Sequence, residues 1–197
     1  PTVRQWKENV PLKNFHLIVD TEILKEGISL YLHLPFCEVL CTYCGCNKRI
    51  TKNHSVEEKY MEYILKEWKM YLALLPSNTI LKELHLGGGT PTFFSPENLR
   101  QLITSLYEGV VLHDEFEASF EGHPNNTTRE HLQVLFDVGF RRVSYGVQDL
   151  DDKVQIAIHR IQPHENVVKV VEYAREIGYT SINFDLIYGL PFQNQNT

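Results

Sequence analysis

Five short segments in which apolar and polar residues alternate constrain the fold of this chain more than any other feature. Alternation with a period of two is typical of a half-buried strand, and these segments cover residues 28–34, 83–88, 115–121, 141–148 and 180–189. Helix signals lie between them. Strands that alternate with helices pair in parallel, because each helix returns the chain to the same end of the sheet. The sequence therefore predicts an α/β fold, either an open doubly wound sheet or a barrel.

Residues that start and stop helices support this alternation. Capping boxes are predicted at Ser55 with Glu58 and at Thr127 with Glu130, and Ser95 before Pro96 has the pattern of an N-cap followed by proline at the first helical position. Glycines at 139 and 178 stand one or two residues before the next strand, where a left-handed residue ends a helix.

The two faces of the predicted strands distinguish a barrel from an open sheet. Parallel strands covered by helices on both faces are nearly continuous apolar runs, whereas here one face of every strand is polar. The polar face carries Tyr31, His33, His85, Glu117, Ser119, Glu121, Arg142, Ser144, Gln148, Asn183 and Asp185. A solvated face on an antiparallel sheet is the alternative, and the intervening helices argue against it. We therefore expect a partial parallel (β/α) barrel with about five of six strand–helix units in view and a polar lumen.

Composition and charge limit the classes of partner and the cellular locations to expect. The chain has 197 residues, 43% of them hydrophobic and 22% charged, with a formal net charge of −6. Lysine and arginine are dispersed, which predicts no nucleic-acid partner and no membrane surface as partner. Apolar runs stay short of a membrane span, so we expect a cytoplasmic protein. The chain begins at Pro1 and ends shortly after a strand-like run, and we expect a fragment of a longer protein.

All four cysteines lie within ten residues, at 37, 41, 44 and 46. A cytoplasmic chain rarely keeps disulfides, and four thiols at this density exceed what core packing needs. A four-thiolate zinc site is the rival interpretation, but structural zinc sites usually use two separated pairs. Three thiolates at x3 and x2 spacing can hold three corners of an iron–sulfur cube and leave the fourth iron open for a ligand. The spacing favours an iron–sulfur cluster.

These motifs resemble those of a known family. C-x3-C-x2-C after a first strand, with Tyr43 before the third cysteine, resembles the signature of the radical S-adenosylmethionine (SAM) enzymes, and GGGTPT at 87–92 resembles their glycine-rich contact to the methionine amino group. Within that superfamily, residues 31–47, 87–99, 146–155 and 182–191 together resemble the oxygen-independent coproporphyrinogen III oxidases.

The resemblance implies an activity, cofactors and partners. The expected reaction is the oxidative decarboxylation of two propionates of coproporphyrinogen III to vinyl groups, giving protoporphyrinogen IX in haem biosynthesis. The implied cofactors are a [4Fe-4S] cluster and two SAM molecules, and the implied partners are an external electron donor and acceptor. The full-length protein is expected to be a monomer. A haem-binding or haem-chaperone relative without oxidase activity is the alternative, although such relatives usually lack a cysteine at the position of Cys46.

The resemblance also implies roles for individual residues. Cys37, Cys41 and Cys44 would be the cluster ligands, with Cys46 near the site but not a ligand. Contacts to the SAM on the cluster are expected from Tyr31, Gly88 and Glu121, and contacts to the second SAM from Tyr43, Gly89, Thr90, Gln148, Arg160 and Asp185. No further catalytic side chain is assigned.

The chain departs from the family pattern at one position and in its extent. His123 stands where the family more often has an acidic residue, and we interpret it as structural. Residues 1–27 are expected to form an N-terminal segment and residues 28–197 a radical SAM domain. That domain is expected to be incomplete at its C-terminus, with the covering domain absent.

Overall fold

The computed structural model describes residues 27–194, so the predicted N-terminal segment lies outside the described residues except for Gly27. Five strands form one parallel sheet in the order β1-β4-β5-β6-β7. Their bounds are β1 Ile28–Leu34, β4 Ile80–Gly88, β5 Val111–Gly122, β6 Phe140–Gln148 and β7 Ser181–Leu186. The predicted α/β class and parallel pairing are confirmed. Among the described residues β1 and β7 are the edges of the sheet, so the barrel is partial.

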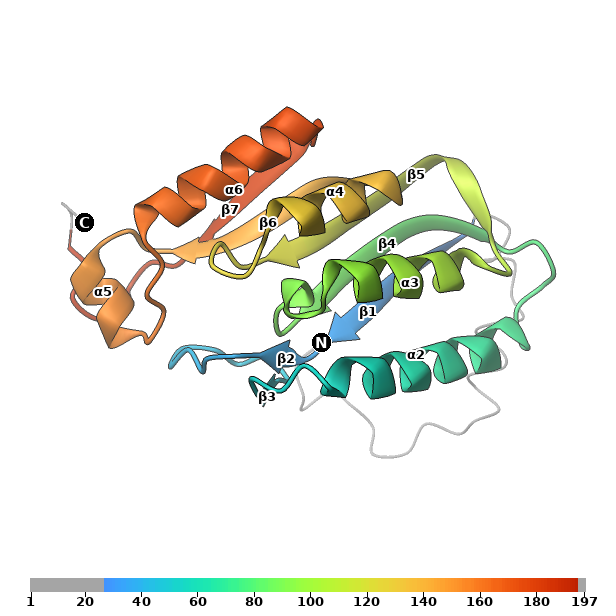
Figure 1. The fold of residues 1–197 in the computed structure, drawn as a ribbon, viewed down its shortest axis with the longest axis horizontal. Helices are drawn as coiled ribbons and strands as arrows, with labels where there is room; N and C mark the ends of the chain where they lie inside the picture. Colours follow the sequence, from blue (N-terminus) through green and yellow to red (C-terminus); the bar gives the residue numbers. More distant parts are fainter. Residues whose placement is uncertain (1–26, 195–197) are drawn as a thin grey trace.

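Four helices cover one face of the sheet (Figure 1). They are α2 Val56–Leu72, α3 Pro96–Tyr107, α4 Arg129–Asp137 and α6 His164–Ile177. Shorter elements gather near the carboxyl ends of the strands: β2 Phe36–Cys37, β3 Arg49–Ile50, the 3-10 helix η3 Pro91–Phe93, and α5 Asp152–Ala157. None of the described helices is long and apolar enough to cross a membrane.

The core lies between this face and the helices. Leu34, Leu86, Phe120 and Tyr145 point to it from four successive strands and are fully buried. On the edge strand, Phe184 pairs in register with Tyr145 but is 47% exposed. Burial of the apolar face therefore decreases toward β7.

The opposite face is polar, as predicted. Neighbouring strands exchange side-chain hydrogen bonds across it, including His85 Nδ1 with Ser119 Oγ at 2.8 Å and Ser144 Oγ to Asp185 Oδ1 at 3.0 Å. These cross-strand bonds satisfy polar groups that would otherwise need water.

Helix starts are only partly as predicted. Ser95 caps α3, because its Oγ accepts from Asn98 N at 3.2 Å. The box predicted at Thr127 lies one residue later, where Thr128 pairs with His131. Ser55 makes no side-chain cap, so that prediction is wrong. Ser55 N instead donates to Asn53 Oδ1 at 3.0 Å.

The predicted helix ends are confirmed at both glycines. Gly139 follows α4 with φ of +105°, and Gly178 ends α6 with φ of +111°. A side chain at either position would be strained in this left-handed conformation.

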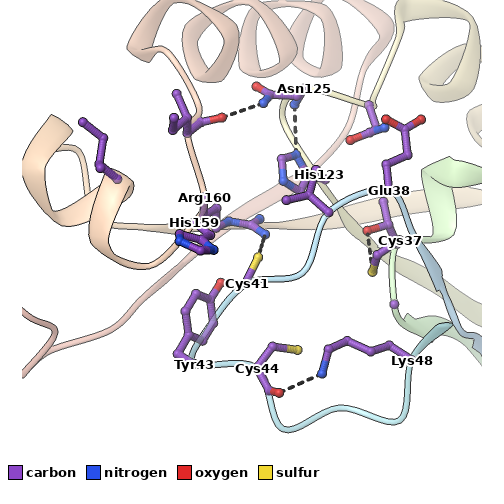
Figure 2. A pocket seen from close by; sticks show the side chains of 16 residues that line it. Cys37, Glu38, Cys41, Tyr43, Cys44, Lys48, His123, Asn125, His159 and Arg160 are labelled. Carbon is purple, nitrogen blue, oxygen red and sulfur yellow. Dashed lines mark hydrogen bonds between the residues drawn. The ribbon is translucent and has the colours of Figure 1, made fainter. Parts of the chain in front are cut away.

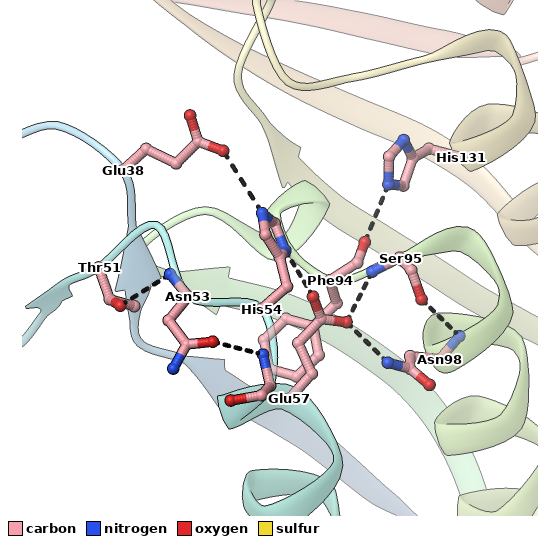
Figure 3. A network of polar contacts seen from close by, with 10 residues as sticks. Glu38, Thr51, Asn53, His54, Glu57, Phe94, Ser95, Asn98 and His131 are labelled. Atoms are coloured by element: carbon pink, nitrogen blue, oxygen red, sulfur yellow. Dashed lines mark hydrogen bonds and ion pairs between the residues drawn. The ribbon is translucent and has the colours of Figure 1, made fainter.

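A buried carboxylate joins the starts of α2 and α3 (Figure 3). Glu57 is 1% exposed, and its Oε2 accepts from Ser95 N at 2.8 Å and from Asn98 Nδ2 at 2.7 Å. Its Oε1 lies 2.7 Å from His54 Nδ1. The His54 ring stacks on Phe93 with centroids 4.4 Å apart. This network holds the segment after the cysteines against η3.

Candidate radical SAM site

A cavity of about 590 Å³ opens beside the cysteine loop, near the carboxyl ends of the strands (Figure 2). Seven of the predicted site residues line it: Cys37, Cys41, Tyr43, Cys44, Gly89, Thr90 and Arg160. These residues come from three separate parts of the chain. In parallel α/β folds the ends of neighbouring strands meet at one edge, which is why ligand sites form there.

The cysteine loop is closed by backbone pairing. Arg49 N donates to the Pro35 carbonyl at 2.8 Å, and Thr51 N donates to the Cys37 carbonyl at 2.9 Å. Inside the loop, Lys48 Nζ donates to the Cys44 carbonyl at 2.8 Å. The thiols are therefore presented on a loop whose two ends are held together.

Two of the thiols have neighbours that differ in their electrostatic effect. Burial raises the pKa of Cys37, and the hydroxyl of Thr90, 3.4 Å from its Sγ, acts in the opposite direction. At Cys44 burial also acts to raise the pKa, but hydrogen bonds with Cys46 and the charge of Lys48 lower it overall. A cationic side chain beside the loop favours the thiolate form that binds iron.

The donor set fits an iron–sulfur cluster. Three thiols face one cavity, whereas Cys46 is exposed and does not line it. Across residues 27–194, no three side chains of His, Cys, Asp or Glu converge closely enough to hold one metal ion. A cube of four irons and four sulfides needs its thiolates further apart than a single ion does. Three thiols that face one cavity suit the three protein-bound corners of such a cluster.

The glycine turn after β4 packs directly on the cysteine loop. Gly89 N donates to the Leu34 carbonyl at 2.9 Å, and Thr90 N donates to the Phe36 carbonyl at 2.9 Å. A Cβ at Gly89 would lie 2.6 Å from the Pro35 carbonyl carbon, which is closer than packing permits. This position requires glycine for close approach.

Tyr31, Gly88 and Glu121 lie together on the polar face, with Tyr31 in the middle of β1 and the other two near the carboxyl ends of β4 and β5. Glu121 Oε2 accepts from Gly88 N at 3.2 Å, and the Tyr31 ring stacks on His85 with centroids 5.9 Å apart. The His85 ring, whose Nε2 lies 3.6 Å from Glu121 Oε1, is the main cause that lowers the pKa of Glu121. Partial burial opposes it and the Gly88 amide assists it. This carboxylate is anionic and positioned to receive a cation or a hydroxyl.

Gln148, Arg160 and Asp185 meet around Gly146. A Cβ on this glycine would lie 2.6 Å from Gln148 Nε2 and 3.0 Å from Arg160 Nη2, and Asp185 is its pairing partner on β7. Gln148 also lines a second cavity of about 660 Å³ that is bordered by Leu186 and Tyr188. The structure thus brings these three together, and it places Arg160 in the first cavity and Gln148 in the second.

The sequence alone did not predict several residues of this region. Gly146 lines neither cavity but lies against Gln148 and Arg160, and it carried a signal, because an isolated glycine in a strand marks a close approach. Lys48, Asn125 and His159 line the cavity without belonging to a motif. His123 also lines it, with its Nδ1 accepting from Asn125 N at 3.1 Å. Burial, with the charge of Arg160, lowers the pKa of His123 to about 3, so its ring is neutral.

Comparison with known proteins gives the family. The model of the radical SAM superfamily matches residues 31–197. The chain belongs to the radical SAM superfamily. It therefore has the two cofactors of that superfamily, a [4Fe-4S] cluster and SAM.

Individual relatives carry a more specific name. Oxygen-independent coproporphyrinogen III oxidase from Helicobacter pylori strain J99 is 43% identical over 99% of the chain and 44% of that protein. The enzyme of the same name from Pseudomonas aeruginosa is 39% identical over 100% of the chain and 44% of that protein. The solved structure of coproporphyrinogen III oxidase from Escherichia coli superposes with a TM-score of 0.92 at 36% identity. That match covers 98% of the chain and 44% of the solved one. The chain spans less than half the length of these relatives.

Proposed function

We propose that the protein containing this chain is an oxygen-independent coproporphyrinogen III oxidase. It would decarboxylate two propionates of coproporphyrinogen III to vinyl groups and so produce protoporphyrinogen IX for haem biosynthesis. The observation that carries the proposal is the meeting of the cysteine loop, the glycine turn and Arg160 around one cavity. Relatives of that name match nearly the whole chain, which supports the oxidase over a haem-chaperone relative.

The residues of the chain have distinct tasks in this proposal. Cys37, Cys41 and Cys44 would hold the cluster as its three thiolate ligands. When bound, the cluster supplies one electron and SAM supplies the group that takes a hydrogen atom from the substrate. The Thr90 hydroxyl lies 3.4 Å from the Cys37 sulfur and orients Cys37, the first of the three thiolate ligands.

Two SAM sites are part of the proposal. Tyr31, Gly88 and Glu121 contact the SAM on the cluster, with the Glu121 carboxylate receiving its ammonium or ribose hydroxyls. The bond between Glu121 and the Gly88 amide supports this pairing.

The second SAM is assigned to six residues that carry donors, acceptors or a close backbone: Tyr43, Gly89, Thr90, Gln148, Arg160 and Asp185. Burial raises the pKa of Tyr43, so its ring stays neutral and can pack against a ligand. The Arg160 guanidinium pairs with a carboxylate of the ligand. The gathering of three of these residues around Gly146 supports a shared ligand.

The proposal also includes the cellular location, the partners and the oligomeric state of the protein. A cytoplasmic location is supported by the dense thiols, which a reducing compartment preserves. An external electron donor and acceptor, no nucleic-acid or membrane partner, and a monomeric full-length protein complete the assignment.

The test is anaerobic incubation of the full-length protein with coproporphyrinogen III, SAM and a reductant, followed by mass spectrometry of the porphyrins. Loss of two CO₂ and gain of two vinyl groups is the expected result. The matched control is Cys41→Ala, which lacks one cluster ligand and should give no product. A protein that cleaves SAM but leaves all four propionates intact would refute the assignment.

A further inference from the structure

The segment from the end of β6 to the start of α6 contains two buried glutamines that the proposed function does not use. Gln162 is 0% exposed and Gln155 is 3% exposed. Buried amide side chains are uncommon unless their polar groups are bonded. Their partners therefore show what holds this segment.

The side-chain amide of Gln155 exchanges two hydrogen bonds with the backbone of Gln162. Gln162 N donates to Gln155 Oε1 at 2.9 Å, and Gln155 Nε2 donates back to the Gln162 carbonyl at 3.2 Å. The same Nε2 donates to the Asp149 carbonyl at 3.0 Å. One side chain thus joins the start of this segment to its end.

Gln162 binds the end of β6 itself. Pairing between β5 and β6 stops at Gly122 with Tyr145, and beyond that point the Val147 carbonyl accepts a backbone bond from Asp149 N at 2.8 Å. Gln162 Nε2 donates to the Val147 carbonyl. The adjacent carbonyl of Gly146 accepts from Arg160 Nε at 3.1 Å. The side chains of Arg160 and Gln162, from one loop, therefore donate hydrogen bonds to two successive carbonyls of β6.

The side-chain oxygen of Gln162 is unbonded, so the side chain is held through its Nε2, which donates to the Val147 carbonyl. Within residues 27–194, Gln162 Oε1 is the buried side-chain oxygen that accepts no hydrogen bond. Methionine or leucine would fill the same space without burying an unbonded oxygen. Only an amide or similar donor reaches the carbonyl.

These hydrogen bonds also determine the position of Arg160, which lies two residues before Gln162. Its guanidinium is held over Gly146, and Nη1 lies 3.6 Å from the Cys41 sulfur (Figure 2). Arg160 N also donates to the Gln155 carbonyl at 2.9 Å. Backbone and side chain of this arginine are therefore fixed by the same segment, between α5 and the cavity.

We propose that Gln155 and Gln162 are positioning residues that hold Arg160 in the geometry needed to bind the carboxylate of the second SAM. The proposal rests on the proposed function, because it assigns Arg160 to that ligand. A small displacement of a charged group in a binding site costs as much as roughly a hundredfold in function. We expect a loss of roughly tenfold in affinity at the second site when either glutamine is replaced.

The experiment measures SAM binding without turnover. Full-length protein with its cluster reconstituted is titrated with SAM in the absence of reductant, and the number of bound molecules and their affinities are determined calorimetrically. Variants Gln162→Met and Gln155→Met keep the side-chain volume and lose the hydrogen bonds of the amide, which for Gln155 include the bond that its Oε1 accepts from Gln162 N. Gln133→Met is the matched control, since Gln133 is exposed on α4 and donates only to Asp137.

The expected result is a weakened second site in both variants, with iron content and the first site unchanged. A double-mutant cycle then separates positioning from general packing. In an Arg160→Ala background, Gln162→Met should weaken binding no further. An equal additional loss in that background, or normal binding in the single variants, overturns the proposal. If Arg160→Ala itself binds two SAM molecules normally, the assignment of Arg160 to the second SAM fails, and this outcome is distinct from failure of the glutamine pair alone.

Discussion

Replacing Glu57 with alanine would remove the acceptor that joins the starts of α2 and α3. Its Oε2 receives the Ser95 amide and the Asn98 side chain at 2.8 and 2.7 Å, and the side chain is almost completely buried. A hydrogen bond to a charged group contributes about 1.5–3 kcal/mol. Two such bonds at the lower limit give a loss of about 3 kcal/mol, the lower part of the range for breaking a buried charged pair.

The loss of stability is best measured locally, at the start of α3. A local loss of about 3 kcal/mol corresponds to a roughly hundredfold faster hydrogen exchange, which mass spectrometry of peptides from 91–107 resolves in the full-length protein. Glu58→Ala is the control, because Glu58 is exposed one residue further along the same helix and surface changes stay within about 0.5 kcal/mol. Glu57→Gln should fall between the two, since it keeps one oxygen acceptor and loses the charge.

If Glu57→Ala exchanged no faster than Glu58→Ala over those peptides, the carboxylate would not be what holds α2 against α3. The contact would then depend on packing of the apolar residues of the two helices. Trp68, whose Nε1 donates to the Leu106 carbonyl at 3.0 Å, would be the next residue to test.

Three further predictions concern the site. Cys44→Ala should lose the cluster absorbance of the anaerobically reconstituted full-length protein, whereas Cys46→Ala should keep most of it; equal loss would indicate a closed four-thiolate site. Gly89→Ala should reduce iron incorporation at least tenfold, because its Cβ would meet the Pro35 backbone at 2.6 Å, and normal iron content would show that the turn can move. Since the pKa of Glu121 is lowered, its stabilising effect is complete above the ordinary value of 4.5 and is lost as pH falls below it. Urea unfolding of the cluster-free protein should therefore show a steeper acid loss in wild type than in Glu121→Gln, and parallel curves would contradict this.

The strands were predictable because their pattern is local. Alternation in 28–34 placed β1 at its observed bounds, and a polar residue on every second position identified the face that carries Glu121 and Asp185. Caps were less predictable. Thr127 and Thr128 offer the same hydroxyl to the chain, and the choice of Thr128 depends on His131, whose Nε2 contacts the Phe94 carbonyl at 2.9 Å.

The sequence by itself predicted the parallel sheet and grouped three cysteines in one loop as candidate cluster ligands. Both predictions depend on short-range patterns: the spacing of the cysteines, and strands of period two with helix signals between them. Only the tertiary structure decided which distant residues share a site. Arg160 lies 119 residues after Cys41, yet its Nη1 lies 3.6 Å from that sulfur. No local pattern encodes this contact. It follows from the end of β6, where pairing with β5 stops and the carbonyls of Gly146 and Val147 accept hydrogen bonds from side chains of the next loop.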